Sequence, residues 1–243
     1  RTRAAGRLTS HFSRRGAYVD SMTDADVSTV FLDLDDTICR HPTSGADRLA
    51  DAFDAAGVDP FFDGSDVRRW LPEVSADTLV GLRENFFGAI ADERGREQAD
   101  ALAVARAYED PDPTDVEFLP GAEAALDRLG ATHDLALVTN GGRETQTAKL
   151  RALDIADHFG ALTFAGSDHA VKPDPEPFDH ALAAMDATPE ETVHVGNSLR
   201  SDVAGAHAAG LRSVWLEESE SVGEYDPHHT IGSMHDLHDP PWI

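Results

Sequence analysis

Short apolar runs rich in β-branched residues recur along the chain, and each ends in polar residues or glycine. They cover 27–34, 134–139, 161–165, 192–195 and 213–216. Between them lie segments with apolar residues at helical spacing, at 121–129, 144–153, 176–185 and 201–209. Strands that alternate with helices and are nearly continuously apolar predict a doubly wound, parallel α/β sheet. Such sheets bind ligands beyond the carboxyl ends of their strands.

The stretch after the first strand breaks this rhythm, because it contains helix-like segments and no clear strand. The expected helices cover 46–56, 66–71, 76–94 and 97–108, with turn residues such as Gly57 and Pro60 between them. We therefore expect an α/β core domain formed by 22–40 and 117–243, with an all-helical domain, 41–116, inserted into it. A module inserted there lies over the strand ends, where a lid belongs.

The charge balance limits the partners. The 243 residues include 45 Asp and Glu against 20 Lys and Arg, a net charge of −25. Such a chain repels nucleic acid and anionic membrane surfaces. No stretch approaches the roughly 20 apolar residues that a membrane-spanning helix needs. We expect a small molecule as the partner, no nucleic acid, no membrane, and a monomer or a homodimer.

The choice of basic residues indicates adaptation to salt. Eighteen are arginines and only two are lysines, Lys149 and Lys172. An acidic, lysine-poor chain is typical of halophilic organisms, because high salt screens the repulsion between acidic groups. A single cysteine, Cys39, fits a reducing compartment, and we expect a cytoplasmic protein. Residues 1–21 hold five arginines and one acid and are expected to be a disordered extension.

The first apolar run ends in the most informative residues of the chain, Phe31-Leu32-Asp33-Leu34-Asp35-Asp36-Thr37. Side chains alternate along a strand, so Asp33 and Asp35 leave it on the same side. Two crowded carboxylates repel each other, and a fold tolerates them mainly when a cation resolves the repulsion. They are candidates for a metal-dependent catalytic pair, although a helix cap or a turn explains such a pattern as well.

Three further motifs follow predicted strands. Thr139-Asn140-Gly141-Gly142 offers a hydroxyl and exposed backbone N–H groups, which suit an anion. Lys172, before Pro173, offers a compact positive charge. Asn197 and Asp202 follow Gly196 and offer oxygens suited to a hard cation. Each motif alone is weak, since turns and surface lysines are common.

In this order, the four motifs resemble those of the haloacid dehalogenase (HAD) superfamily over 27–243, and the inserted helices resemble its cap. The resemblance implies a Rossmann-like core and a Mg²⁺-dependent phosphatase acting on a small phosphorylated metabolite. It implies a nucleophile, Asp33, that becomes an aspartyl-phosphate, and an acid and base, Asp35. It also implies phosphate binding by Thr139, Asn140 and Lys172, and Mg²⁺ binding by Asp33, the Asp35 carbonyl, Asn197 and Asp202.

Two features separate this chain from parts of that family. The dehalogenase branch lacks the second aspartate, because a halide leaves without a proton, so Asp35 favours phosphoryl chemistry. Asn197 stands where the family usually has Asp, and a neutral ligand binds Mg²⁺ more weakly. A phosphotransferase or mutase, a 2-haloacid dehalogenase and a non-catalytic binding module remain as alternatives. Arg83, Asn85 and His41 are candidates to contact the substrate.

Overall fold

The central sheet is doubly wound and parallel, as the apolar pattern predicts. The computed structural model describes residues 26–70, 79–108, 110–217, 222–223 and 225–242. The extension predicted for 1–21 lies outside these residues. Six parallel strands run in the order β5 (Ala161–Phe164), β4 (Asp134–Thr139), β1 (Thr29–Leu32), β6 (Thr192–Gly196), β7 (Arg212–Leu216) and β8 (His229–Ile231).

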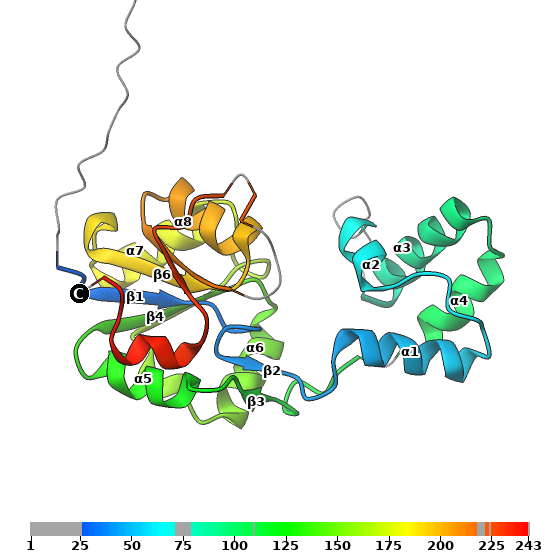
Figure 1. Cartoon of the computed structure of the whole chain (residues 1–243), viewed down its shortest axis with the longest axis horizontal. Coiled ribbons are helices and arrows are strands. Elements are labelled where there is room, and N and C mark those ends of the chain that lie inside the picture. The colour runs from blue at the N-terminus through cyan, green and yellow to red at the C-terminus, as the bar shows by residue number, and fades with distance from the viewer. Residues whose placement is uncertain (1–25, 71–78, 109, 218–221, 224, 243) are drawn as a thin grey trace, which may run out of the picture.

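Helices cover both faces of this sheet because the central strand is apolar on both (Figure 1). Val30 and Leu32 pack with Leu126 on one face, and Phe31 packs with Phe178 on the other. The alternation follows from the two-residue period of a strand. The first face carries α5 (Ala122–Gly130), α6 (Arg143–Ala152) and a 3₁₀ helix, η5 (Met234–His238). The second carries α7 (Glu176–Met185) and α8 (Ala204–Ala208).

Short helical turns complete the core. Two 3₁₀ turns, η2 (Ala156–His158) and η3 (Pro189–Glu191), precede β5 and β6. A single π-helical turn, η4 (Leu199–Val203), leads into α8. The helix expected at 201–209 is therefore a π-helical turn followed by a short α-helix. This turn carries Asp202 and fixes how that residue faces the sheet.

The inserted segment forms a helical module with its own core. It consists of α1 (Gly45–Ala56), α2 (Gly64–Trp70), α3 (Leu79–Arg94) and α4 (Gln98–Ala107). Ser44 caps the start of α1 by accepting from the Asp47 N–H, and Gly57 ends that helix in the left-handed conformation. The module core includes Phe53, Phe87 and Ile90. Within the described residues, no helix has both the length and the apolar character needed to cross a membrane.

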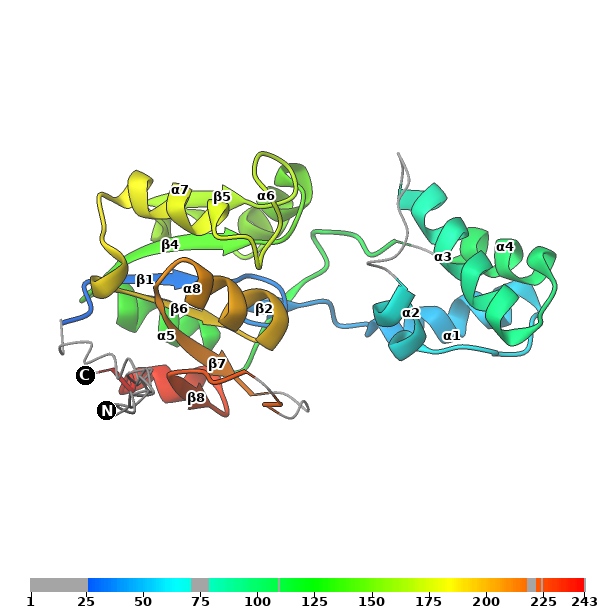
Figure 2. The same cartoon turned by 90° about the horizontal axis from the view of Figure 1, so that it is seen from above.

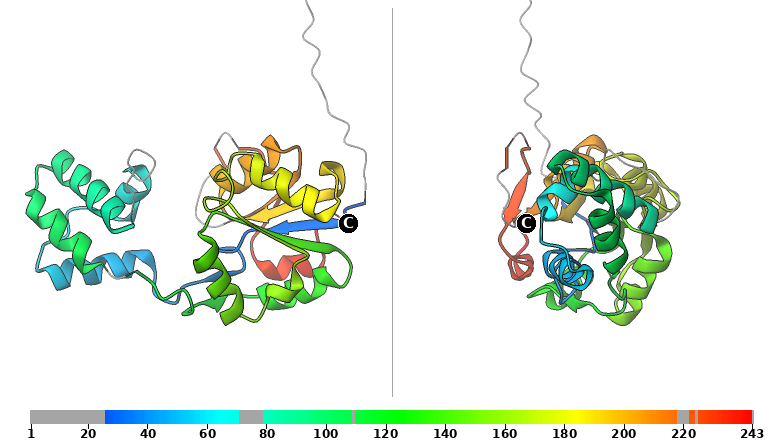
Figure 3. Two further views of the ribbon diagram at one scale, coloured as in Figure 1. Left: turned by 180° about the vertical axis from the view of Figure 1, so that it is seen from behind. Right: turned by 90° about the vertical axis from the view of Figure 1, so that its right-hand side faces the viewer.

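A two-stranded ribbon, which the sequence pattern does not predict, connects the sheet to this module. β2 (Cys39–Arg40) pairs antiparallel with β3 (Glu117–Phe118) where the chain leaves and re-enters the core. Arg40 and Glu117 form an ion pair across it at 3.0 Å. Two-residue strands are too short to show a period, which is why the sequence shows no strand there. The module lies beyond the carboxyl ends of the sheet strands (Figures 2 and 3).

Candidate active site

The candidate residues gather where the strand order reverses. β1 lies between β4 and β6, so the chain passes from β1 to one side of the sheet and later to the other. Asp33 directly follows β1, Thr139 ends β4 and Gly196 ends β6. Leu32 pairs in register with Leu137 and Val195, which sets the three strand ends side by side. This position is the usual ligand crevice of a doubly wound sheet.

Lys172 lies at the centre of the site and is almost fully buried. Its ammonium donates to Asp33 Oδ1 at 2.8 Å, to the Val138 carbonyl at 2.7 Å and to Asp202 Oδ1 at 2.6 Å. These contacts use all three donors of an ammonium. Burial lowers the pKa of Lys172, but the charges of Asp202 and Asp33 outweigh burial and raise it. One cation therefore neutralises two buried carboxylates.

Asp33 is the more weakly stabilised of these two carboxylates. Burial raises its pKa to about 7, against the opposing effect of Lys172, and the charge of Asp202 raises it further. Thr37 donates a long hydrogen bond to Asp33 Oδ2 at 3.4 Å. A buried carboxylate that Lys172 neutralises only in part suits a nucleophile, because it is poorly solvated and its Oδ2 is only weakly hydrogen-bonded.

Asp202 is held more tightly. Its Oδ1 also accepts from His194 Nε2 at 3.0 Å, and its Oδ2 accepts from the Ser198 N–H at 3.0 Å. Burial raises the pKa of Asp202, but Lys172 and His194 more than reverse this and hold it below its ordinary value. Gly196 makes the position possible, since a Cβ there would overlap the Asp202 carboxyl carbon.

Asp35 is half-buried and is held by helix α6. Lys149 Nζ lies 2.5 Å from Asp35 Oδ1, and Gln146 Nε2 donates to Asp35 Oδ2 at 2.8 Å. The same Gln146 nitrogen donates to Thr139 Oγ1 at 2.7 Å. Sequence reasoning missed both α6 residues. The rarity of lysine could have pointed to Lys149, because one of only two lysines in the chain lies ten residues after Thr139.

The side chain of Asn140 fixes the loop that carries Lys172. Its Oδ1 accepts from the Lys172 N–H at 2.7 Å, and its Nδ2 donates to the Lys172 carbonyl at 3.0 Å. This reciprocal pair ties the end of β4 to the loop before α7. The backbone N–H of Asn140 remains the group that the sequence suggests for an anion, while its side chain orients the lysine.

The donor chemistry of the site fits Mg²⁺. Asp33 and Asp202 supply carboxylate oxygens, and a single lysine leaves them with net negative charge. In the part of the chain that the structure describes, no three His, Cys, Asp or Glu side chains are close enough to hold a metal alone. Mg²⁺ usually keeps several bound waters and also coordinates substrate oxygens. Two protein carboxylates, together with neutral oxygen donors, are therefore enough to bind it. Asn197 follows β6, where its backbone carbonyl accepts from Trp215 Nε1 at 2.8 Å.

A cavity of about 770 Å³ opens from Asp35 toward the helical module. Its volume is within the usual range for a small-molecule site. The module contributes the apolar rings Phe86 and Phe87 and the basic residues Arg48 and Arg83. Arg83 is buried and donates to Asp110 at 2.5 Å and to the Tyr108 carbonyl at 2.8 Å, so much of its bonding is structural. Asn85 borders a separate depression.

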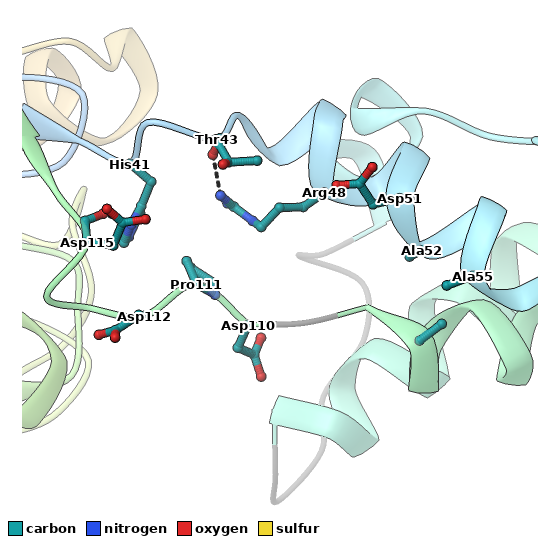
Figure 4. A pocket seen from close by; sticks show the side chains of 11 residues that line it. His41, Thr43, Arg48, Asp51, Ala52, Ala55, Asp110, Pro111, Asp112 and Asp115 are labelled. Carbon is teal, nitrogen blue, oxygen red and sulfur yellow. Dashed lines mark hydrogen bonds between the residues drawn. The ribbon is translucent and has the colours of Figure 1, made fainter.

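His41 belongs to the joint between the two parts. Its Nδ1 lies 2.8 Å from the Asp115 carbonyl, which links the outgoing segment to the returning one. Figure 4 shows these residues around a second cavity of about 410 Å³, which is also lined by Arg48 and Asp112. Arg48 reaches back to the Thr43 carbonyl in the same view. The predicted substrate contact His41 therefore lines both cavities.

Comparisons with known proteins agree with this geometry. A family model described as haloacid dehalogenase-like hydrolase matches residues 27–210. The chain is 31% identical to the phosphoserine phosphatase of Thermus thermophilus, over 86% of this chain and 96% of that protein. It is 30% identical to the ribulose-1,5-bisphosphate 5-phosphatase of Halopiger xanaduensis, over 58% of this chain and 63% of the relative.

A solved structure shares the fold. The HAD-hydrolase YfnB from Bacillus subtilis, crystallised with magnesium bound, superposes with a TM-score of 0.63. The alignment covers 88% of this chain and 97% of YfnB, at 24% identity. The sheet and the inserted helices therefore follow an arrangement that is known from experiment.

Proposed function

The chain belongs to the haloacid dehalogenase-like hydrolases, and on that premise we propose that it is a Mg²⁺-dependent phosphatase of a small phosphomonoester. The pairing of Asp33 with Lys172 at the switch point of the sheet is the observation that carries this proposal. A carboxylate attacks a phosphate dianion only if positive charge offsets their repulsion, and Lys172 provides part of that charge. The named relatives, which are phosphatases of small metabolites, support the same substrate class.

The reaction proceeds in two steps on the residues of this chain. An Asp33 oxygen attacks phosphorus, the bond to the leaving oxygen breaks, and Asp35 gives that oxygen its proton. Asp35 then takes a proton from water, which attacks phosphorus, releases inorganic phosphate and restores the Asp33 carboxylate. Thr139 and the Asn140 N–H hold phosphate oxygens. Asp33, the Asp35 carbonyl, Asn197 and Asp202 would hold Mg²⁺, which would supply electrostatic stabilisation of the transferring group when bound.

The cavity next to Asp35 is the proposed place for the organic part of the substrate. Its wall combines aromatic rings with Arg48 and Arg83, so it suits a small polar metabolite. We also propose that the helical module, residues 41–116, is a cap that closes over the strand ends and excludes water during the first step. Interdomain movement is described for YfnB, which supports such closure. The His41 to Asp115 contact lies at the proposed hinge.

The experiment is hydrolysis of p-nitrophenyl phosphate in high-KCl buffer, with Mg²⁺ or with EDTA. Wild type is compared with Asp33→Asn and with Asp36→Asn, which removes the neighbouring charge at a left-handed position that Asn tolerates. We expect Mg²⁺-dependent activity that Asp33→Asn abolishes and Asp36→Asn largely retains. The proposal is contradicted if the folded wild-type protein hydrolyses neither this ester nor any of a panel of metabolite phosphates. Phosphate that passes to a second substrate, with none released to water, indicates a phosphotransferase instead.

A further inference from the structure

We propose that Lys149 and Gln146 of helix α6 are positioning residues that hold the acid and base Asp35 and tie it to Thr139. This inference rests on the proposed function and deepens it. Neither residue belongs to the four motifs in the sequence. Both come from one helix that follows β4, and they reach Asp35 across more than a hundred residues of chain.

The contacts leave Asp35 little freedom. Lys149 binds one carboxylate oxygen and Gln146 binds the other, so rotation of the carboxylate breaks both interactions. Lys149 and Gln146 are three positions apart and therefore face the same side of α6. The next residue, Leu150, is fully buried in the core, which anchors the helix against the sheet.

Gln146 also sets the direction of the Thr139 hydroxyl. A side-chain amide has two N–H donors, and Gln146 uses one on Asp35 and one on Thr139. Because Thr139 Oγ1 accepts this bond, its own hydrogen can point to a phosphate oxygen. Gly141 makes room, since a Cβ there would lie 2.5 Å from the Gln146 amide carbon. The Gln146 amide thus orients both the proposed acid, Asp35, and the proposed phosphate-binding hydroxyl of Thr139.

Each of the two lysines of the chain binds one of the two proposed catalytic carboxylates. Lys172 contacts Asp33, and Lys149 contacts Asp35. Both ammonium groups are buried, with side-chain exposures of 1% and 7%. Each ammonium is a compact point charge on a flexible stem, which lets it reach a single carboxylate oxygen. In a chain with 18 arginines, both lysines thus lie beside the proposed catalytic carboxylates.

The test uses leaving groups that differ in their need for a proton. Nitrophenolate leaves unprotonated, whereas the alkoxide of glycerol phosphate needs the acid. We expect Lys149→Met to lower kcat/KM for glycerol phosphate about 100-fold and for p-nitrophenyl phosphate less than about tenfold. Gln146→Met is expected to lower both, because it also frees Thr139. Arg151→Met, an exposed change on the same helix, is the control and should leave both values unchanged.

A double-mutant cycle separates positioning from substrate binding. If Lys149 acts through Asp35, Lys149→Met adds nothing in an Asp35→Ala background. Additive losses of Lys149→Met and Asp35→Ala, or an equal loss for both esters in Lys149→Met, overturn the inference. Lys149→Arg keeps the charge and should recover part of the glycerol phosphate activity, which shows that a loss is not misfolding. A wild type inactive on every ester overturns the proposed function itself, whereas an active wild type with additive losses overturns only this inference.

Discussion

Lys172 Nζ lies 2.8 Å from Asp33 Oδ1, although the two residues are 139 positions apart in the sequence. The same ammonium lies 2.6 Å from Asp202, so two buried carboxylates share one positive charge. The site is therefore short of positive charge before any ligand binds. The excess negative charge of the two carboxylates favours binding of a cation. The same charge lowers the stability of the ligand-free fold.

Removal of the Asp33 charge should stabilise the metal-free protein. The pKa of Asp33 rises from 3.8 to about 7 on folding, so the folded state binds more protons than the unfolded state between these values. Stability therefore falls as pH rises through this range, and the full penalty is present above about pH 7. In EDTA at pH 8, Asp33→Asn should raise Tm by roughly 5 °C. The gain should shrink toward pH 4; an equal gain at both pH values shows that the Asp33 charge does not destabilise the fold.

Much of this fold follows from local pattern. The strand expected at 134–139 and the helix expected at 176–185 have the observed bounds, because 135–138 form a continuous apolar run between polar residues and Pro175 precedes the helix. The four motifs also indicate which strand ends carry the site, and the structure brings Asp33, Thr139, Lys172 and Asp202 together there.

Long-range side-chain contacts could not be predicted from the sequence. Lys149 meets Asp35 only because α6 has a particular rotation over a particular strand order, and neither is visible in a single sequence. The β2–β3 ribbon was missed because two residues show no period. Arg83 is a candidate for substrate binding by its charge, but its ion pair with Asp110 depends on how α3 and α4 pack.

Gly196→Ala should lower both stability and activity by displacing Asp202. The added methyl overlaps the Asp202 carboxyl group, which must then leave Lys172 and the Ser198 N–H. We expect a loss of about 2 kcal/mol in the free energy of unfolding and at least a tenfold loss in kcat. Gly130→Ala is the control, since its nearest contact is an ordinary 3.6 Å to Leu135. Denaturant unfolding and phosphatase assays measure the two effects. If Gly196→Ala changes neither stability nor activity, the observed position of Asp202 is not required.

Asn197→Asp should tighten Mg²⁺ binding. A carboxylate directly after β6 would add negative charge to the proposed Mg²⁺ site, where Asp33 and Asp202 are the proposed carboxylate ligands. The Mg²⁺ concentration for half-maximal activity should fall roughly tenfold. The companion change Asn197→Ala should raise it. If neither activation curve moves, Asn197 is not a metal ligand.

The protein should be more stable in concentrated salt. A net charge of −25 disfavours the compact state, and salt screens this repulsion. Thermal unfolding should shift to higher temperature between about 0.1 M and 3 M KCl, because the Debye length falls to about 3 Å at 1 M. A Tm that is the same at both concentrations argues against adaptation to high salt.

Chemical trapping of the phosphoenzyme tests most directly whether Asp33 is the nucleophile. Wild-type protein is mixed with Mg²⁺ and a phosphomonoester that it hydrolyses, quenched in acid and reduced with borohydride, which converts an acyl phosphate to an alcohol. Mass spectrometry of the peptide that spans β1 should then show homoserine at position 33. Rapid phosphate release that leaves Asp33 unmodified at every quench time would show that Asp33 is not the nucleophile.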